Sequence, residues 1–295
     1  MFGSNIKKKK IKTQSIYFLF IVPALIIFII FRAWPIIYSF ILSFFDVNII
    51  SGNTFIGLKN YISLIHDQTY IKSLLVTIRF TSIILPLTII WSLFVSIFLD
   101  YKFLRYPNFF KSLFFMPFVT SWVVISLIWK WFLNSKFGLV NQIFSILHLP
   151  EQNWLTNPKV TLWAVIVITI WKMGGYFILI FLANLQIIDP SLYEAAEVDG
   201  ANFWNKFRYI TLNALKPAFY ITLITGTIFY FRTFVIIFAM TGGDPLGTTD
   251  LLAYHTYQLA FRSFEFGQAS ASIVFMFAII VVVLLLQIAF FERKD

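Results

Sequence analysis

The chain has 295 residues, of which 59% are hydrophobic and 12% charged, and its net charge is +10 at neutral pH. With a mean hydropathy of +0.83, this composition is typical of an integral membrane protein and excludes a soluble globular domain. The sequence contains no cysteine, which excludes disulfides, a thiol nucleophile and a cysteine metal site. The histidines His66, His148 and His255 are far apart and form no zinc motif, so no metal site is expected.

The densest positive charge precedes the first apolar segment, in the lysines of residues 7–10 and Lys12. This position predicts a basic cytoplasmic N-terminus (1–15) that fixes the orientation of the chain and contacts anionic membrane lipid, rather than a nucleic-acid site. No cleavable signal peptide is expected, because no small-residue cleavage site follows a short apolar stretch.

Six apolar segments are long enough to cross a membrane, since a helix needs about 20 mostly apolar residues to do so. They predict an all-α transmembrane domain over residues 16–291, and a hairpin of two short spans stays open for the first segment, which continues past Arg32. Prolines within the segments predict kinks at Pro23, Pro35, Pro86 and Pro117. The six segments are residues 16–40, 73–99, 109–133, 160–183, 217–240 and 269–291.

The positive charges predict the orientation of these spans. With the N-terminus inside, the inner segments hold 13 of the 23 Lys and Arg residues, the outer segments hold 5, and the spans hold 5. Positive charge favours the cytoplasmic side of a membrane. We therefore expect a protein of the plasma membrane whose two termini, including the tail 292–295, and whose loop 184–216 lie on the cytoplasmic side. The composition, rich in Ile, Phe and Lys, indicates an AT-rich genome and a bacterial source.

Acidic residues are absent from the interior of the predicted spans. All 13 lie outside or at the edges, whereas carriers driven by protons or cations usually place a carboxylate within the membrane. A phosphate-binding loop of the GxxxxGK[ST] type is also absent. If the chain drives uphill transport, the energy must therefore come from another polypeptide.

The cytoplasmic loop contains an unusually polar stretch, "EAAEVDGANFWNKFRYITL". Asp189 followed by Pro190 predicts the N-cap and first position of a short helix, which Gly200 ends. A second helix is expected after Asn202, with apolar residues on one face. Two short helices joined at a glycine predict a rigid docking element for another protein, and an amphipathic helix lying on the membrane is the alternative.

The same stretch resembles the EAA motif of ABC importer permeases, in which Glu-Ala-Ala is followed by a glycine and then by Ile-x-Leu-Pro. Asn213 stands where the family usually has proline, and Pro217 follows soon after. This departure bears on whether the chain bends after Leu212 and not on the motif itself. The resemblance implies that this stretch contacts a separate ATPase subunit. The residues implied in coupling are Glu194, Ala195, Ala196, Asp199, Gly200, Ile210 and Leu212.

The resemblance extends over nearly the whole chain. Segments such as "WPIIYSFILSFFDVN", "FFMPFVTSWVVISLIWKWF" and "MTGGDPLGTTDLLAYHTYQLAF" are similar to maltose-type (MalF-like or UgpA-like) sugar permeases. This implies a type I ABC importer permease (MetI-like) bundle with a cytoplasmic EAA coupling helix. The implied partners are a second permease, two ATPase subunits that hold ATP and Mg, and an extracellular substrate-binding protein.

The implied function is import of a sugar or oligosaccharide, without enzymatic activity or a cofactor in this chain. An importer of a glycerol-phosphate-type or other anionic polyol is the alternative. A carrier outside the ABC class is less favoured because the spans carry no carboxylate, and a membrane enzyme because neither membrane face carries a cluster of acids or histidines outside the EAA stretch. A structural or assembly protein without transport stays open, and only a partner or uptake experiment separates it from the importer.

Lys172 and Arg232 are the deepest charges in the predicted spans. Such residues face a bundle interior or a wet cavity, so each could cap backbone carbonyls of a neighbouring helix or line the translocation path. The turn-rich loop Gly242, Gly243, Asp244, Pro245 is either a plain connection or, as the resemblance implies, a contact for the binding protein. The candidates for the path are Thr120, Ser121, Trp122, Lys172, Tyr176, Tyr230, Arg232 and Thr233.

Overall fold

The computed structural model describes residues 20–48, 52–100 and 105–292. The predicted basic N-terminus (1–15) and residues 293–295 of the predicted tail lie outside this part of the chain. The chain divides into two compact units, one of residues 1–64 and 259–275, the other of residues 65–258 and 276–295. Each unit is described by itself.

The first unit begins with one apolar helix, Phe20–Leu42, which is long enough to span a membrane. It contains a π-helical turn at Ile29–Ala33, followed by α2 (Trp34–Leu42). Pro35 has no backbone N–H to donate, and the wider turn just before it absorbs this loss without ending the helix. The alternative of two short spans in this segment is therefore wrong.

A short β-hairpin follows this helix, a feature that the sequence analysis did not predict. Strands β1 (Phe45–Asn48) and β2 (Gly52–Phe55) pair antiparallel, and α3 (Lys59–His66) comes next. The side-chain amide of Asn60 donates to the carbonyls of Ser43 and Phe45, each at 2.9 Å, and so ties α3 to the start of the hairpin.

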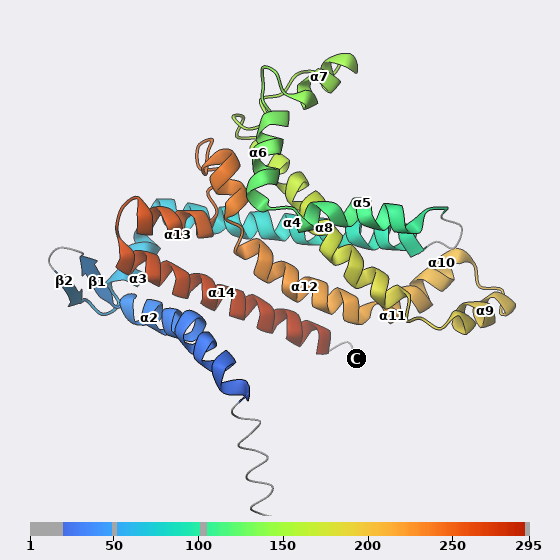
Figure 1. Cartoon of the computed structure of the whole chain (residues 1–295), viewed down its shortest axis with the longest axis horizontal. Coiled ribbons are helices and arrows are strands. Elements are labelled where there is room, and N and C mark those ends of the chain that lie inside the picture. The colour runs from blue at the N-terminus through green and yellow to red at the C-terminus, as the bar shows by residue number, and fades with distance from the viewer. Residues whose placement is uncertain (1–19, 49–51, 101–104, 293–295) are drawn as a thin grey trace, which may run out of the picture. The chain divides into compact units, whose positions relative to one another are not determined.

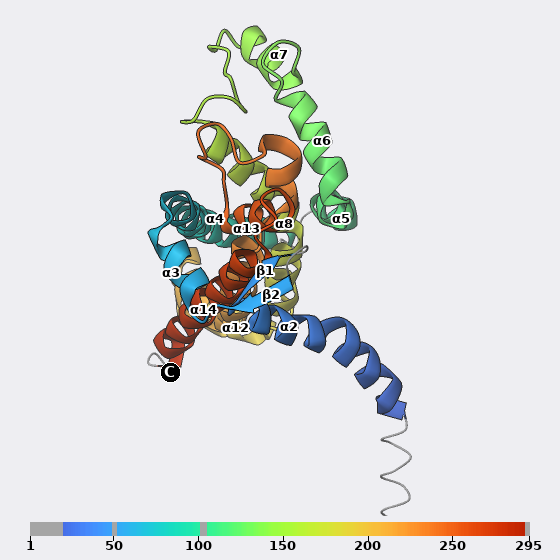
Figure 2. The ribbon, with the colours of Figure 1, turned by 90° about the vertical axis from the view of Figure 1, so that its left-hand side faces the viewer.

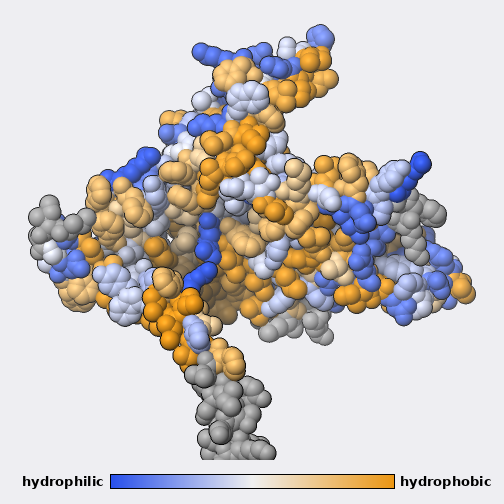
Figure 3. Space-filling view, viewed as in Figure 1, coloured by the Kyte–Doolittle hydropathy of each residue, from blue (hydrophilic) through white to orange (hydrophobic). Residues whose placement is uncertain are grey.

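The second unit is built around α4 (Gln68–Asp100), α8 (Thr161–Leu185) and α12 (Lys216–Phe231). Figures 1 and 2 show these helices running side by side, with α5 (Pro107–Val119) along α8. Their shared core contains Phe80, Ile84, Val165 and Phe177, all fully buried. Apolar side chains also dominate the outer surface of this unit in Figure 3, as expected of helices that face lipid.

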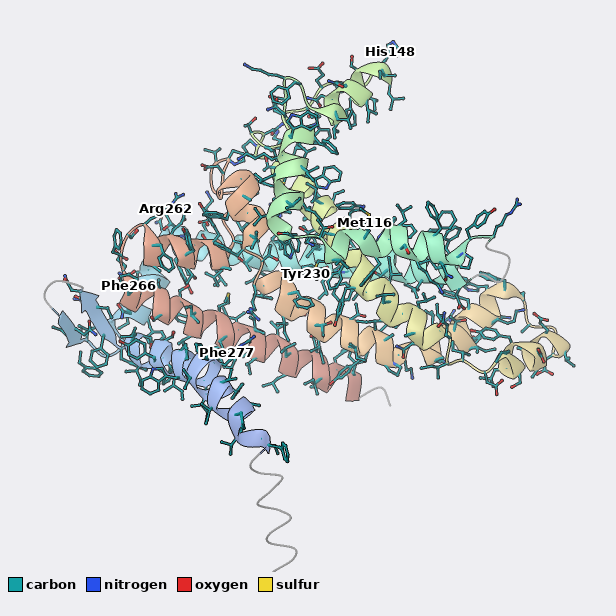
Figure 4. All side chains as sticks on the ribbon, viewed as in Figure 1. Met116, His148, Tyr230, Arg262, Phe266 and Phe277 are labelled. Carbon is teal, nitrogen blue, oxygen red and sulfur yellow. The ribbon has the colours of Figure 1, made fainter. Side chains whose placement is uncertain are left out.

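The predicted third span, 109–133, is not one straight helix. It consists of α5 and α6 (Trp122–Phe132), which meet at an angle of 99° because Thr120 and Ser121 adopt extended backbone conformations. Figure 1 shows α6 leading away from α5 toward α7 (Leu139–Ile146), and His148 lies just beyond α7 in Figure 4. Hydropathy does not distinguish a continuous span from a broken one, which is why the sequence did not reveal the turn.

The predicted fifth span, 217–240, is interrupted as well. Helix α12 ends at Phe231 with Arg232 as its C-cap, and a π-helical segment, η3 (Ile237–Thr241), follows after a short break. The other predicted spans agree with α4, α8 and α14 (Phe266–Glu292) to within about five residues. Among the described residues, four helices are long enough to cross a membrane, or up to six spans if each bent pair counts as one. The remaining elements are α9 (Pro190–Val198), α10 (Phe203–Asn205), η2 (Lys206–Thr211), α11 (Leu212–Ala214) and α13 (Leu252–Phe261).

Candidate functional site

The segment from Asp189 to Ala214, here called the α9–α11 segment, lies at one end of the second unit, between α8 and α12 (Figure 1). Its first helix, α9, begins as the sequence predicts. The Asp189 carboxylate accepts a hydrogen bond from the backbone N–H of Ser191 at 2.9 Å, and Pro190 occupies the first turn. This backbone donor lowers the pKa of Asp189, since it stabilises the ionised form.

The end of α9 forms a complete glycine cap. Gly200 has φ +76°, its N–H donates to the carbonyl of Glu197 at 3.0 Å, and the N–H of Ala201 donates to the carbonyl of Ala196 at 2.8 Å. This pair of bonds is the Schellman arrangement, which requires a left-handed residue. Gly200 therefore sets the direction in which the chain leaves α9, as the sequence predicted.

The second arm, α10 to α11, begins at Asn202, whose side chain accepts from the N–H of Asn205 at 2.9 Å. Two contacts tie this arm back to α9, and neither pairing is predictable from the spacing of these residues in the chain. Lys206 Nζ lies 2.5 Å from Glu197 Oε1, and the hydroxyls of Tyr193 and Thr211 lie 2.9 Å apart. These cross-links make the α9–α11 segment one rigid body rather than two loose helices.

The surface of the α9–α11 segment exposes large apolar side chains. Val198 is 89% exposed, Phe203 73% and Trp204 60%, in a stretch that also carries carboxylates and lysine. Phe203 stacks on Phe207 with the ring centroids 6.5 Å apart, which keeps the aromatic face ordered. An exposed apolar patch rimmed by polar groups is typical of a protein interaction site.

The predicted coupling residues all lie in this segment. Glu194, Ala195, Asp199 and Gly200 are exposed, whereas Ala196, Ile210 and Leu212 are partly buried. The bend that follows Leu212 is present, since the helix Phe203–Ala214 meets α12 at 59°. Pro217 stands in the first turn of α12, where a missing N–H costs little, so the absence of proline at position 213 does not remove the bend.

Lys172 of α8 reaches the break between α5 and α6. Its ammonium donates to the carbonyls of Pro117, Phe118 and Thr120 at 3.0, 3.2 and 2.6 Å and lies 4.7 Å from the centroid of the Trp122 ring. These carbonyls at the end of α5 lack intrahelical partners and carry the negative end of the helix dipole. The structure therefore assigns Lys172, which is only 1% exposed, the capping role that the sequence left open.

The other candidates for the translocation path occupy different environments. Tyr176 stacks on Phe118, with the ring centroids 5.3 Å apart. Tyr230 is 1% exposed, its hydroxyl lies 2.8 Å from that of Thr88, and Figure 4 shows it within the helix bundle. Arg232 is exposed where α12 ends. At the α5–α6 break, Thr120 is partly buried and Ser121 is exposed. Thr233, just after the end of α12, is partly buried. Their role in the path stays a prediction.

The loop after η3 is ordered by one threonine. Thr249 donates its hydroxyl to the carbonyl of Asp244 at 2.8 Å, and its N–H donates to the carbonyl of Gly243 at 3.3 Å. Gly242 and Gly243 have φ of 63° and 87°, a region that favours glycine. Asp244 and Pro245 line a cavity of about 330 Å³ together with Lys130, Trp154 and residues near them. The role of this loop as a binding-protein contact also stays a prediction.

Nothing in the described residues indicates a metal centre. No group of three or more His, Asp or Glu side chains within this part of the chain is arranged to hold an ion. In the α9–α11 segment, the Asp189 carboxylate caps α9 and the Glu197 carboxylate pairs with Lys206.

The long apolar helices define a membrane protein, and comparison with known proteins identifies it as a transport component. Residues 68–294 match the family described as the binding-protein-dependent transport system inner membrane component. The chain belongs to this family. It is the permease subunit of an ABC importer, a multi-pass membrane protein and a transport component rather than an enzyme.

Curated relatives align along most of the chain. A probable ABC transporter permease of Pyrococcus horikoshii is 32% identical over 90% of this chain and 92% of its own. The trehalose/maltose transport system permease MalF of Thermococcus litoralis is 31% identical over 97% of each chain. These matches confirm the resemblance to the maltose-type permeases.

A solved structure shares the fold. A bacterial ABC transporter involved in the import of the acidic polysaccharide alginate superposes with a TM-score of 0.86 at 23% identity, over 97% of this chain and 98% of that chain. This likeness confirms the predicted permease bundle.

Proposed function

We propose that this permease moves a sugar or oligosaccharide into the cytoplasm, and that separate ATPase subunits drive it by pushing on the α9–α11 segment. The main support for the coupling role is the exposed apolar face of the α9–α11 segment, whose two arms are held together by side-chain contacts. Val198, Phe203 and Trp204 would be costly to leave in water, so a protein partner that buries them is favoured.

The carbohydrate substrate is supported by the relatives. Besides the trehalose/maltose permease, a probable permease for starch degradation products of Thermoanaerobacterium thermosulfurigenes is 29% identical over 98% of this chain. Family membership favours import by an ABC system over the carrier, enzyme and structural alternatives.

The complete importer would contain this chain, a second homologous permease, two ATPase subunits with ATP and Mg, and an extracellular binding protein. A solved alginate transporter in complex with a pentasaccharide-bound periplasmic protein supports the last of these partners. In this arrangement the transmembrane domain covers residues 16–291, both termini lie in the cytoplasm, the loop 184–216 faces the ATPases, and the loop Gly242–Pro245 faces the binding protein. ATP-driven closure of the ATPases would rock the bundle between outward-open and inward-open states.

An anionic polyol is the second candidate substrate. A relative from Yersinia enterocolitica, the sn-glycerol-3-phosphate permease UgpA, is 29% identical over 94% of this chain, and Arg232 is an exposed cation at the end of α12. Uptake assays with Arg232→Gln test this alternative. Loss of glycerol-phosphate uptake would favour it, whereas unchanged uptake of every substrate would remove Arg232 from the path.

Co-purification tests the proposed assembly. The tagged chain is expressed in its native host, solubilised gently and analysed by mass spectrometry. Recovery of a second permease and an ATPase is the expected result. Recovery of this chain alone under several mild detergents would contradict the proposal.

A further inference from the structure

A second cavity of the second unit is lined by positive charge. It has a volume of about 390 Å³ and lies where the first turns of α4 approach the start of α8. Lys72 and Arg79 come from α4, and Lys159 lies two residues before α8. No carboxylate of the described residues lines the cavity. Because three cations without a counter-charge repel one another, this arrangement favours an anionic ligand.

The three cations are not engaged with acidic partners elsewhere. Arg79 and Lys159 form no ion pair with any residue that the structure describes, and Lys72 donates to the backbone carbonyl of Leu246 at 2.7 Å. The carbonyl contact holds one Lys72 proton and leaves two for a ligand. The charges of Arg79 and Lys159, which both line the cavity, are therefore not neutralised by any described carboxylate.

The spacing along α4 puts its two cations on one face of the helix. Lys72, Val76 and Arg79 stand at i, i+4 and i+7, on one face of the helix, and Arg79 lies about 10 Å further along the axis. Both side chains line the same cavity, so both can act on one bound anion.

Apart from Thr248, the remaining lining of the cavity is apolar. Val76, Leu162 and Trp163 form part of the cavity wall, and Trp163 is 46% exposed. Next to them on the same helices, Leu75 is 60% exposed and Val167 is 61% exposed, as expected of side chains that contact acyl chains. A tryptophan at the end of a membrane-spanning helix is typical of the headgroup region. The cavity thus combines three cationic side chains with an apolar wall next to side chains that are exposed as lipid contacts would be.

We infer that this cavity binds the headgroup phosphate of an anionic phospholipid, with Lys72, Arg79 and Lys159 around the phosphate and the acyl chains along α4 and α8. The predicted orientation puts this site in the outer leaflet. Basic pockets between membrane helices bind anionic headgroups in this way. The site is independent of the transported substrate and of the ATPase contact, so it stands or falls separately from the proposed function.

Binding to the assembled importer tests the site. The probe is short-chain phosphatidylglycerol, measured by native mass spectrometry and by a thermal-shift titration. Each cation contributes about a 5-fold gain in affinity, so the triple variant Lys72→Gln/Arg79→Gln/Lys159→Gln should bind on the order of 100-fold more weakly. The single variant Lys159→Gln, at an exposed residue outside the helices, should bind about 5-fold more weakly and serves if the triple variant does not assemble.

The matched control removes three charges from other residues that, like Lys72 and Lys159, lie in segments predicted to face the outer side by the distribution of Lys and Arg. Lys59→Gln/Lys136→Gln/Arg262→Gln should retain wild-type affinity to within about 2-fold. Phosphatidylcholine, whose headgroup carries a cation beside the phosphate, should bind much more weakly than phosphatidylglycerol. Equal binding by the Lys159→Gln variant, or no binding because a partner subunit covers the cavity, would overturn the inference. So would glycerol 1-phosphate binding as tightly as the lipid, which would assign the site to a soluble phosphate.

Discussion

Lys172 on α8 donates a hydrogen bond of 2.6 Å to the carbonyl of Thr120, the C-cap of α5. This bond joins the interior of one membrane helix to the break in another. An extended backbone at Thr120 and Ser121 would leave carbonyls without donors in an apolar environment, where each unsatisfied group is costly. The buried ammonium satisfies three of them and so makes the 99° turn tolerable.

Replacing Lys172 with methionine tests this role. Lys172→Met keeps an unbranched side chain that is one atom shorter but removes every donor, which should destabilise the protein by about 1–3 kcal/mol for the unsatisfied carbonyls. The thermal unfolding midpoint of the purified importer should fall by several degrees, and Lys172→Gln, which keeps an amide donor, should be intermediate. The exposed Lys136→Met is the control and should not change the midpoint. An unchanged midpoint for Lys172→Met would contradict the capping role.

The close approach of α5 and α8 depends on Gly175. A Cβ at this position would lie 2.6 Å from the carbonyl oxygen of Phe114, a backbone atom that cannot move aside cheaply. Gly175→Val should therefore separate the two helices and sharply lower the yield of assembled importer on size-exclusion chromatography. Ala183→Val, at an exposed position of the same helix, is the matched control and should assemble normally. Normal assembly of Gly175→Val would mean that α5 does not pack as described.

Gly200 should be sensitive to the backbone conformation of its replacement rather than to side-chain size. Gly200→Pro fixes φ near −65° and removes the N–H that bonds to Glu197, so it should abolish uptake while the protein still inserts in the membrane. Gly200→Asn keeps the N–H and tolerates a positive φ, so it should retain substantial uptake. Glu194→Lys reverses a charge on the exposed face of α9 and should also abolish uptake.

Paired assays of uptake and of membrane insertion separate these effects. Equal uptake by Gly200→Pro and wild type would remove the α9–α11 segment from the coupling mechanism. Equal loss by Gly200→Pro and Gly200→Asn would mean that the glycine acts through its lack of a side chain and not through its conformation.

The N-cap of α9 should be insensitive to pH in the physiological range. The backbone N–H of Ser191 lowers the pKa of Asp189 below its ordinary value of 3.8, so the cap is fully present above that value and is lost only as the pH falls through the lower folded-state pKa. Between pH 5 and 8, hydrogen exchange of the α9 amides, corrected for the intrinsic rate, should not change. Asp189→Ala should raise this exchange severalfold, whereas Asp189→Asn, which keeps the acceptor, should not. A pH-dependent change in this range would assign the cap to another group.

Local signals in the sequence were sufficient for some features and not for others. The caps at Asp189 and Gly200 depend on residues that are close together in the chain, so both caps can be predicted without a structure. The existence and approximate extent of α4, α8 and α14 follow from hydropathy and length, with ends correct to within about five residues. The apolar run through Thr120 and Ser121 has the same composition in a straight and a broken span, so the turn there could not be predicted.

Features that join distant segments were also not predictable. The three carbonyl partners of Lys172 lie more than 50 residues away from it, and Lys159 meets Lys72 and Arg79 only because α4 and α8 pack together. The tie between Tyr193 and Thr211 depends on the angle that Gly200 imposes. In each case the spacing in sequence carries no information about the pairing, which tertiary packing alone determines.

The central claim is that the α9–α11 segment docks on an ATPase subunit, and site-specific photo-crosslinking tests it most directly. A photoreactive residue replaces Val198, the most exposed apolar side chain of the segment, and Val167 on the lipid-exposed face of α8 serves as the matched control. In membranes of the native host, the position 198 variant should give an adduct with the mass of an ATPase subunit, and the position 167 variant should give none. An adduct at position 198 with lipid alone, or ATPase adducts of equal yield at both positions, would contradict the account.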